Sequence, residues 1–561
     1  MKRRRLLAFS LSIFMVASAI AGCSSSGLAG SDDPSPSNQS GSVTPSISEL
    51  SNEVVDYSKN VTSDGKTFIR VGISADPGTF DPLVGSNSTG RQYALNPMAQ
   101  HLLTSNFDME LFGELAKSWD KIDDFTYIIQ IHDNITDSDG NHLTSADVVW
   151  CYEQAKESGI GQSKNISSIK ALDDYNIEFI LDVDTITIFQ SVMRRINIVT
   201  KKAYEDSPNK MATTPVMTGP YVLKEYIPDS KIVVEKRDDY WKTNEAERCF
   251  TEYANADIIE FHVIKEPAQL AIALESGQID MVYGLDTMNA SRFMDGESPK
   301  EGFNRFISKT SSVILLFLNC SAQSVFKDNL ALRQAILYSF DSQAIADGAY
   351  SGGAVPCKAF GSSILPDYLD EWESDDYDYY NYNVDKAKEL VAQSGYKNDE
   401  VINIMVDSDS QRKMVAQILQ NYLLAIDVKT EISSYDQTLF DTYADDPAKW
   451  DIRVDSGSSS DYLASMLDGR FNANKFTEGM YNESFAQDDK LQELVIAAND
   501  PKSFNSETVG ALVSYLNEQA YAVGLVNLVL ETVTTDVVED IVLTFMPNIL
   551  PSSCWFVWNK R

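Results

Sequence analysis

The chain has 561 residues, and its length and charge exclude several classes of protein. At roughly 150 residues per domain, at least two hydrophobic cores are expected. The 46 Lys and Arg residues stand against 82 Asp and Glu residues, so the formal net charge is −36. A field of that sign repels polyphosphates and argues against nucleic-acid binding. The four scattered histidines argue against a zinc site built from histidine.

The N-terminal residues have the parts of a secretory signal. Residues 2–5 are basic, and residues 6–20 form an apolar run that is too short for an ordinary membrane-spanning helix. The small residues Ala21 and Gly22 then precede Cys23. This pattern resembles a bacterial lipoprotein signal peptide, residues 1–22, with Cys23 as the lipidated residue. The mature chain is expected to be lipid-anchored at the outer face of the cell membrane.

A tether and then a folded part follow this signal. Residues 23–65 are rich in Ser, Pro, Gly and Asp, which predicts a flexible, lipid-anchored stalk. Beyond Cys23 an odd number of cysteines remains, so at least one is expected to be unpaired within the chain, and the sequence does not assign any pairing. These cysteines are Cys151, Cys249, Cys320, Cys357 and Cys554.

Strand and helix patterns alternate from Thr67 onward. A β-branched run at residues 68–73 predicts a core strand that ends at a turn, Asp76-Pro77-Gly78. A second strand is predicted at residues 125–131. The apolar helical pattern after it begins at Thr144, with Asp147 three residues later, the arrangement of an N-cap and its acidic partner.

Two strand–helix–strand units lie far apart in the chain. The first is predicted at Asp257–Val282, and the second has a strand at 402–406, a helix at 414–425 and a strand at 428–432. Between them an apolar strand at 313–318 and helices at 330–340 and 342–349, the latter capped by Asp341, are expected. The pattern predicts two α/β lobes that exchange the chain near residues 318–321 and 523–529, with a ligand crevice between them.

Motifs for catalysis and cofactor binding are incomplete. Gly65-Lys66-Thr67 lacks the first glycine of a phosphate loop, and the loop at Asp137 and Asp139 lacks the carboxylates at both ends of a calcium loop. No G-x-S-x-G string is present. We therefore expect no cofactor, no metal and no enzyme activity, with a glycoside hydrolase built on paired carboxylates as the enzymatic alternative.

Ordered segments from about Thr67 to the C-terminus resemble one protein family. They match the extracellular solute-binding proteins, family 5, the oligopeptide, dipeptide and nickel class that serves ATP-binding-cassette importers. The segments are Ala75-Asp76-Pro77-Gly78-Thr79-Phe80-Asp81-Pro82, Leu115-Ala116-Lys117-Ser118-Trp119, Phe125-Thr126-Tyr127, Leu143-Thr144-Ser145-Ala146-Asp147-Val148-Val149, Thr218-Gly219-Pro220-Tyr221, Leu274-Glu275-Ser276-Gly277-Gln278-Ile279-Asp280 and Leu332-Arg333-Gln334-Ala335-Ile336.

The resemblance implies a fold and a mode of action. The fold is α/β, a two-lobed, type II periplasmic-binding-protein-like fold with mixed sheets and a hinge. Lobe I would span 66–318, lobe II 319–525, and residues 526–561 would return to lobe I. The protein would be a monomer that captures oligopeptides outside the cell and delivers them to permease subunits with cytoplasmic ATPases. Trp119, Asp147, Asp280 and Arg333 are expected to be structural.

The resemblance also suggests ligand-binding residues. In peptide-binding relatives an Asp of the second lobe pairs with the peptide's amino group, but the corresponding stretch here, residues 450–462, lacks the Trp and the Asp-Pro of that pattern. The anchor is therefore Asp461, Asp455 or neither, and Asp461→Ala is expected to weaken binding more than tenfold. Arg412 is expected to be either a contact for the peptide's carboxylate or an exposed helix residue. The aromatic candidates either line the cleft or pack in the core. The candidates are Asp461, Tyr462, Asp455, Arg412, Asn319, Phe80, Tyr93 and Tyr221.

Two other functions stay open at this point. The incomplete amine-anchor segment and the aromatic residues also suit an oligosaccharide or another neutral solute. A surface signalling or adhesion lipoprotein could share the fold without transport. Permease and ATPase genes beside this one would favour import.

Overall fold

The computed structural model describes residues 60–84, 89–106, 109–283, 285, 287–296, 298–374, 376–398, 400–459, 461–477, 480–544 and 549–559. The predicted signal peptide, Cys23 and nearly all of the predicted stalk lie outside the described residues. The described residues belong to one compact unit.

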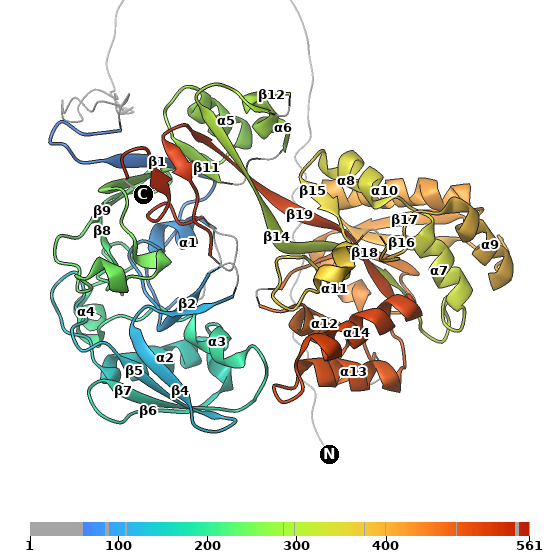
Figure 1. Ribbon diagram of the computed structural model, residues 1–561, viewed down its shortest axis with the longest axis horizontal. Helices are drawn as coiled ribbons and strands as arrows, with labels where there is room; N and C mark the ends of the chain where they lie inside the picture. The colour runs from blue at the N-terminus through green and yellow to red at the C-terminus, as the bar shows by residue number, and fades with distance from the viewer. Residues whose placement is uncertain are drawn as a thin grey trace, which may run out of the picture. The chain divides into compact units, whose positions relative to one another are not determined.

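One large mixed sheet contains both predicted strand–helix–strand units (Figure 1). In the described part of the chain it has 11 strands, in the order β17-β16-β18-β14-β19-β11-β1-β10-β9-β8, with β15 paired to β19. The bounds are β17 Thr430–Tyr435, β16 Ile402–Asp407, β18 Ile452–Gly457, β14 Phe303–Leu318, β19 Ala522–Thr535, β11 Met281–Tyr283, β1 Phe68–Ile73, β10 Ile258–Val263, β9 Lys231–Lys236, β8 Tyr221–Ile227 and β15 Ala354–Pro356.

Strands β14 and β19 join the two parts of this sheet. They lie side by side and antiparallel, from the pair Phe303 and Thr535 to the pair Phe317 and Ala522, with two register shifts. The predicted strand 313–318 is only the buried end of β14, where every side chain is apolar. Residues 303–312 mix polar and apolar side chains and are less buried, so their pattern did not indicate a strand.

Both strand–helix–strand predictions are confirmed. Strands β10 and β11 each pair in parallel with β1, and α5 (Pro267–Glu275) connects them. Strands β16 and β17 are also parallel and are connected by α10 (Ser410–Ala425). This helix begins four residues before the predicted start because the Asp409 side chain caps it, accepting a 2.8 Å hydrogen bond from the Arg412 backbone.

A second, antiparallel sheet follows the order β4-β5-β7-β6. Helix α2 (Ser145–Ser158) packs against it, and the rings of Tyr152 and Phe179 meet edge to face at 5.0 Å. The predicted cap is confirmed, because the Thr144 backbone donates a 2.9 Å hydrogen bond to Asp147. The strands are β4 Ala116–Lys121, β5 Thr126–Ile131, β7 Asn176–Leu181 and β6 Ile166–Ala171.

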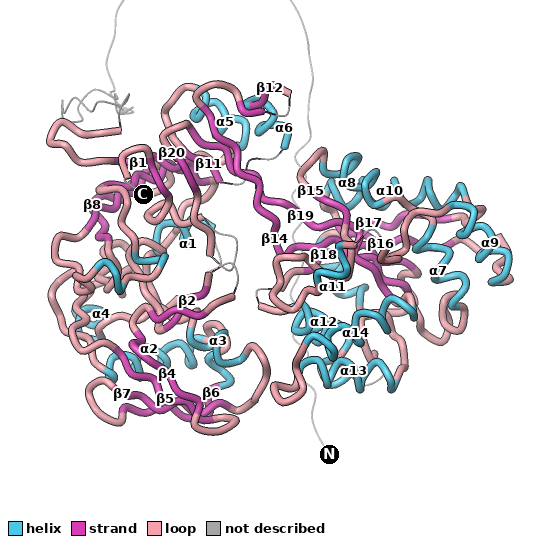
Figure 2. The backbone as a smooth tube through the Cα atoms, viewed as in Figure 1, coloured by secondary structure: helices cyan, strands magenta, loops and turns pink. Residues whose placement is uncertain are grey.

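The remaining elements are mostly helices and short strands. Figure 2 shows that helices flank β16, β17 and β18. The helices are α1 Thr89–Leu95, α3 Ile188–Met193, α4 Lys201–Asp206, α6 Thr287–Ala290, α7 Leu330–Tyr338, α8 Ser342–Tyr350, α9 Val384–Ser394, α11 Gln437–Ala444, α12 Leu463–Phe471, α13 Asp489–Asn499 and α14 Ser506–Gln519. The short strands are β2 Leu103–Ser105, β3 Leu111–Gly113, β12 Met294–Asp295, β13 Ser298–Pro299, β20 Val538–Asp540 and β21 Trp555–Phe556.

Two large groups of buried apolar side chains stabilise the fold. We name them the first core, whose members lie in residues 69–281 and 538–556, and the second core, whose members lie in residues 313–526. A smaller group beside α5 includes Leu270, Leu274 and Phe293. The chain thus leaves the first core, builds the second and returns. The lobe boundaries after residues 318 and 525 stay predictions.

No helix in the described ranges is long and apolar enough to cross a membrane.

Candidate functional site

A cavity of about 440 Å³ lies beside α1 and the end of α3. This volume falls in the range of small-molecule sites, about 300–1,000 Å³. Polar and charged side chains supply much of its wall, and the apolar part includes Pro82, Leu95, Ile160 and Leu550. The polar and charged residues are Arg91, Gln92, Asn96, His101, Thr104, Glu114, Arg194, Arg195, Asn197, Thr251 and Thr544.

Three guanidinium groups line this cavity. Arg91, on α1, is buried and donates a hydrogen bond to the backbone carbonyl of Asp81. Burial lowers the pKa of Arg91, and the nearby Asp81 carboxylate opposes that shift. Arg194 and Arg195 follow the last residue of α3, and Arg194 is buried whereas Arg195 is half-buried. Guanidinium groups favour carboxylate partners, because their planar N–H donors match both oxygens.

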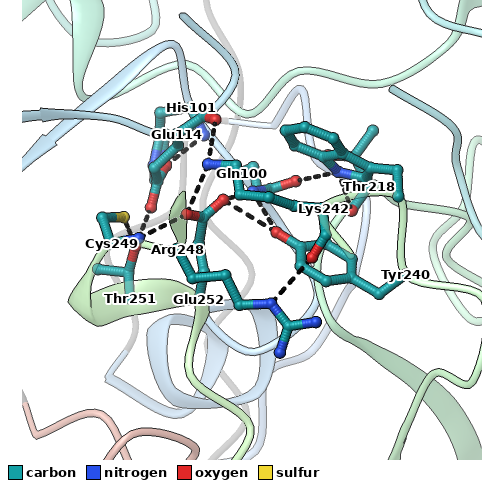
Figure 3. A network of polar contacts seen from close by, with 11 residues as sticks. Gln100, His101, Glu114, Thr218, Tyr240, Lys242, Arg248, Cys249, Thr251 and Glu252 are labelled. Atoms are coloured by element: carbon teal, nitrogen blue, oxygen red, sulfur yellow. Dashed lines mark hydrogen bonds and ion pairs between the residues drawn. The ribbon is translucent and has the colours of Figure 1, made fainter. Parts of the chain in front are cut away.

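Glu114 and His101 form the part of the wall that Figure 3 shows from close by. The His101 backbone donates a 2.7 Å hydrogen bond to Glu114, and the His101 ring nitrogen Nδ1 lies 3.2 Å from the same oxygen. Thr251 donates its hydroxyl to the other Glu114 oxygen at 2.5 Å. Both carboxylate oxygens are therefore held by groups of the protein.

A buried ion pair supports this wall from behind. Lys242 and Glu252 lie 2.7 Å apart, and their side chains are 2% and 1% exposed. Gln100 and Tyr240 donate hydrogen bonds of 2.7 and 2.9 Å to the other Glu252 oxygen (Figure 3). Burial raises the pKa of Glu252, and Lys242 opposes that shift. The ion pair is thus surrounded by donors, as a buried charge requires.

Asp461 meets the cavity wall from the other core. It lies in the loop between β18 and α12, is buried, and forms an ion pair with Arg194. Ser191 of α3 donates to the second oxygen of Asp461 at 3.3 Å. Ile188 and Val192 of α3 belong to the first core, whereas Leu463, two residues after Asp461, belongs to the second. The ion pair therefore connects elements of the two cores.

Tyr462 lies beside this ion pair. Its ring packs edge to face on Phe504 at 5.1 Å. Burial raises the pKa of Tyr462, and a hydrogen bond with the Gln190 side chain of α3 opposes the shift. Tyr462 therefore adds a second contact with α3.

Asp367 holds the start of α12 in place. Its two oxygens accept hydrogen bonds of 2.7 and 2.8 Å from the Leu463 and Ala464 backbones. Ser459 donates its hydroxyl to the Tyr462 carbonyl at 2.7 Å, and accepts from the Asp461 backbone at 3.2 Å. These bonds fix the loop that presents Asp461 to Arg194.

Three other predicted polar residues have partners within the second half of the chain. Asp455 lies in β18 with an oxygen 3.7 Å from Arg453. Arg412 donates two 3.0 Å hydrogen bonds from Nε to the Asp407 carboxylate. Asn319 is buried and donates to the carbonyl oxygens of Pro447 and Trp450 at 2.8 and 2.6 Å. Their roles in ligand binding stay predictions.

The three predicted aromatic residues are buried around the first core. Phe80 packs edge to face on Tyr226 at 5.0 Å. Tyr93 is 2% exposed on α1. Tyr221 donates its hydroxyl to the Ala256 carbonyl at 2.6 Å. They occupy the core positions that the sequence left open as the alternative to cleft walls.

All four residues expected to be structural have structural contacts. Asp280 forms a buried ion pair with Arg70 at 2.6 Å, and Asp147 caps α2. Arg333 donates to the Phe326, Lys327 and Gln519 carbonyls. Trp119, in β4, packs against the first core.

All five cysteines between Cys151 and Cys554 are free and buried. Burial raises the pKa of Cys151, Cys320, Cys357 and Cys554 to about 12. The described residues contain no group of three or more His, Cys, Asp or Glu side chains that could hold a metal ion.

The arginines of the cavity were not among the residues predicted from the sequence. Asp461 and Tyr462 are the predicted candidates that contact α3, and their neighbours there, Gln190 and Arg194, were not predicted. An adjacent Arg194-Arg195 pair directly after a short apolar run was the available signal. It is a weak signal, because adjacent basic residues are usually exposed.

Comparisons with known proteins agree with this fold. The chain is similar to HbpA2 from Haemophilus parasuis (16% identity, TM-score 0.74) and to a putative peptide binding protein, AppA, from Clostridium difficile (18% identity, TM-score 0.71). Each match covers 87% of this chain and 100% of the other. The described elements thus have the α/β fold of the type II periplasmic binding proteins.

Sequence relatives and a family match give the identification. The dipeptide-binding protein of Escherichia coli is 21% identical over 64% of this chain and 70% of its own length. The nickel-binding protein NikA of Staphylococcus aureus is 25% identical over 64% of this chain and 68% of its own length. The fold and these relatives point to one class, the solute-binding proteins of ATP-binding-cassette transporters, whose members bind solutes and are not enzymes.

Residues 110–486 match the bacterial extracellular solute-binding proteins, family 5. The chain belongs to this family.

Proposed function

We propose that this solute-binding protein captures a short oligopeptide outside the cell and delivers it to the permease of its importer. The cavity lined by Arg91, Arg194 and Arg195 carries this proposal. A peptide ends in a carboxylate, the planar anion that a guanidinium group binds with two parallel hydrogen bonds. The main chain of the peptide supplies further donors and acceptors, for which Gln92, Asn96 and Asn197 are suitable partners.

The relatives support this class of ligand. They include a dipeptide-binding protein and a glutathione-binding protein, GsiB of Pectobacterium atrosepticum, which is 22% identical. Peptides and glutathione share carboxylate and amide groups. A cavity of about 440 Å³ suits a short peptide of that kind.

Closure of two lobes would bury the peptide. Strands β14 and β19 connect the two cores, and the contact between α3 and the β18–α12 loop lies next to the cavity. Rotation about the connecting strands would open and close that contact.

Native mass spectrometry of the full chain, purified without denaturant, tests the proposal. We expect adducts whose masses differ by amino-acid residues, and calorimetry should then show that amidating the peptide's C-terminus weakens binding at least tenfold. Arg195→Gln should weaken binding of the free acid more than of the amide, whereas Lys202→Gln on exposed α4 should change neither. Adducts spaced by hexose masses, or no binding of any peptide, would contradict the proposal.

We also propose that Cys23 carries the lipid that holds the protein at the outer face of the cell membrane. Cells grown with an alkyne-labelled palmitate should label the wild-type chain, and Cys23→Ser should remove the label. Retained labelling in that variant would place the lipid elsewhere.

A further inference from the structure

We propose that Arg194 determines ligand specificity by holding the Asp461 carboxylate in an ion pair. The protein then binds its solute without using an ammonium group of that solute as the anchor. This inference rests on the proposed function, because it concerns the solute held in the same cavity. It predicts that a peptide with a blocked N-terminus binds as well as one with a free N-terminus.

The geometry of the ion pair carries the first step. The side chains of Arg194 and Asp461 are 1% and 7% exposed. Arg194 is itself fixed by hydrogen bonds from its guanidinium to the Gln190 carbonyl, at 3.1 Å, and to Ser105. A ligand ammonium group that took Asp461 would leave the buried guanidinium without its counter-ion. The loss of one partner of a buried ion pair is strongly unfavourable, so the exchange is disfavoured.

The other carboxylates near the cavity are also held by the protein. Glu114 accepts hydrogen bonds from the His101 backbone and from Thr251. Asp81, behind Arg91, accepts from the Leu83 backbone at 3.0 Å and from Tyr204 at 3.3 Å. Among the described residues, each of these three carboxylates thus has partners from its own chain. An ammonium group of the ligand would have to displace one of these partners.

The cavity surface itself favours an anion. Arg91, Arg194 and Arg195 line it, and of the described carboxylates only Glu114 does. Asp461 and Asp81 balance the charge of the arginines from positions outside the lining. Guanidinium groups carry a positive charge and match the two oxygens of a carboxylate. The end of the ligand that is recognised is therefore its carboxylate.

Two peptide libraries test the inference. The probes are a mixed tripeptide library and the same library acetylated at the N-terminus, with bound species measured by native mass spectrometry. The wild-type protein should bind both libraries within about threefold of each other. Arg194→Gln should expose Asp461 to the ligand, so that free tripeptides bind at least tenfold more tightly than acetylated ones. A tenfold or greater preference of the wild type for free tripeptides would overturn the inference.

Two further variants control for folding and for charge. Arg195→Gln keeps the ion pair and should weaken both libraries without creating a preference between them. The double variant Arg194→Gln/Asp461→Asn leaves no unpaired buried charge and should also show no preference. A preference for free tripeptides in either variant would mean that a group other than Asp461 reads the amine.

A measurement without ligand separates this inference from the proposed function. In hydrogen exchange followed by mass spectrometry, Arg194→Gln should speed the exchange of residues 188–193 and 461–465 at least fivefold, whereas Arg195→Gln should not. If neither library binds the wild type, the proposed function fails, and faster exchange still supports the pairing of Arg194 with Asp461. Unchanged exchange in Arg194→Gln would overturn it.

Discussion

The ion pair of Lys242 and Glu252 shows how the first core accepts charges that its apolar surroundings disfavour. Each charged atom faces an opposite charge or a hydrogen-bond donor or acceptor, including the Glu114 carbonyl, which accepts from Lys242 at 3.1 Å. Such a pair stabilises the fold only while both members are present. The wall of the cavity therefore depends on residues that do not touch its ligand.

Removing Lys242 should destabilise the protein. In Lys242→Met, Glu252 stays buried without its cation, which costs about 3–5 kcal/mol of unfolding free energy. The matched control is Lys202→Met, whose pair with Asp206 is exposed at 68% and 67%, and whose urea midpoint should be unchanged. Equal urea midpoints for the two variants would show that the buried pair is unimportant.

Glu252 should also make stability depend on pH. Burial raises its pKa above the ordinary value of 4.5, so the folded state binds the proton more tightly than the unfolded state. Its contribution to stability is therefore complete below pH 4.5 and is lost as the pH rises through the raised pKa. The unfolding free energy of wild type minus that of Glu252→Gln should fall from pH 4.5 to pH 7 in urea titrations. A rising difference would mean that attraction by Lys242 outweighs burial.

For single residues, the sequence indicated which side chains could bind a ligand better than it indicated where they lie in the fold. The incomplete amine-anchor pattern indicates Asp461, which does lie next to the cavity wall, but its partner Arg194 is 267 residues away in the chain. No local pattern reports such a pair, because it forms only when two distant elements meet. Phe80 and Tyr221 were ambiguous for the same reason, since an aromatic residue suits a cleft and a core equally well.

Among the elements, local patterns predicted those that form regular units. The strand–helix–strand units around α5 and α10 were found because their periodicity is complete within about 35 residues. The full length of β14 was missed, since its N-terminal half gains its strand structure from pairing with β19. That a single sheet runs through both units was missed too, because β14 and β19 make that connection.

Strand β19 should tolerate no side chain at Gly524. A Cβ there would lie 2.6 Å from the Cys357 sulfur and 3.1 Å from the Ala359 carbonyl. Gly524→Ala should lower the unfolding free energy by about 1–3 kcal/mol through overpacking. Gly469→Ala on α12, where nothing lies within 4 Å, should raise it by about 0.5–1 kcal/mol. Urea unfolding of both variants measures these changes. A Gly524→Ala variant more stable than the wild type would contradict the close packing of β19.

The Asp367 cap of α12 should hold the loop that carries Asp461 as well as stabilise the helix. Asp367→Ala removes both acceptors at the start of α12, which costs about 1–2 kcal/mol and frees the loop that carries Asp461. Hydrogen exchange should therefore rise in residues 461–465. Asp436→Ala removes the cap of α11 and should cost a similar amount without changing that exchange. Equal exchange of residues 461–465 in both variants would mean that the Asp367 cap does not hold this loop.

For the whole molecule, the question is whether the two cores unfold together. Strands β14 and β19 extend from one to the other, and Arg194 and Asp461 connect them at a second place. Cooperative unfolding is expected where elements are shared in this way, whereas cores joined only by loops open separately.

The buried thiols can measure this directly. Cys151 and Cys554 belong to the first core, and Cys320 and Cys357 to the second. Because burial raises their pKa to about 12, all four should resist a thiol-specific alkylating reagent in the native protein and react once their core opens. Alkylation across a urea series, assigned to each cysteine by peptide mass mapping, should give one midpoint for all four. A peptide at a free concentration of 100 times its dissociation constant should raise the unfolding free energy by about 2.7 kcal/mol. The urea midpoint should then rise equally for both cores. Two separate midpoints, one for each pair of cysteines, would instead mean that the connecting strands do not couple the cores.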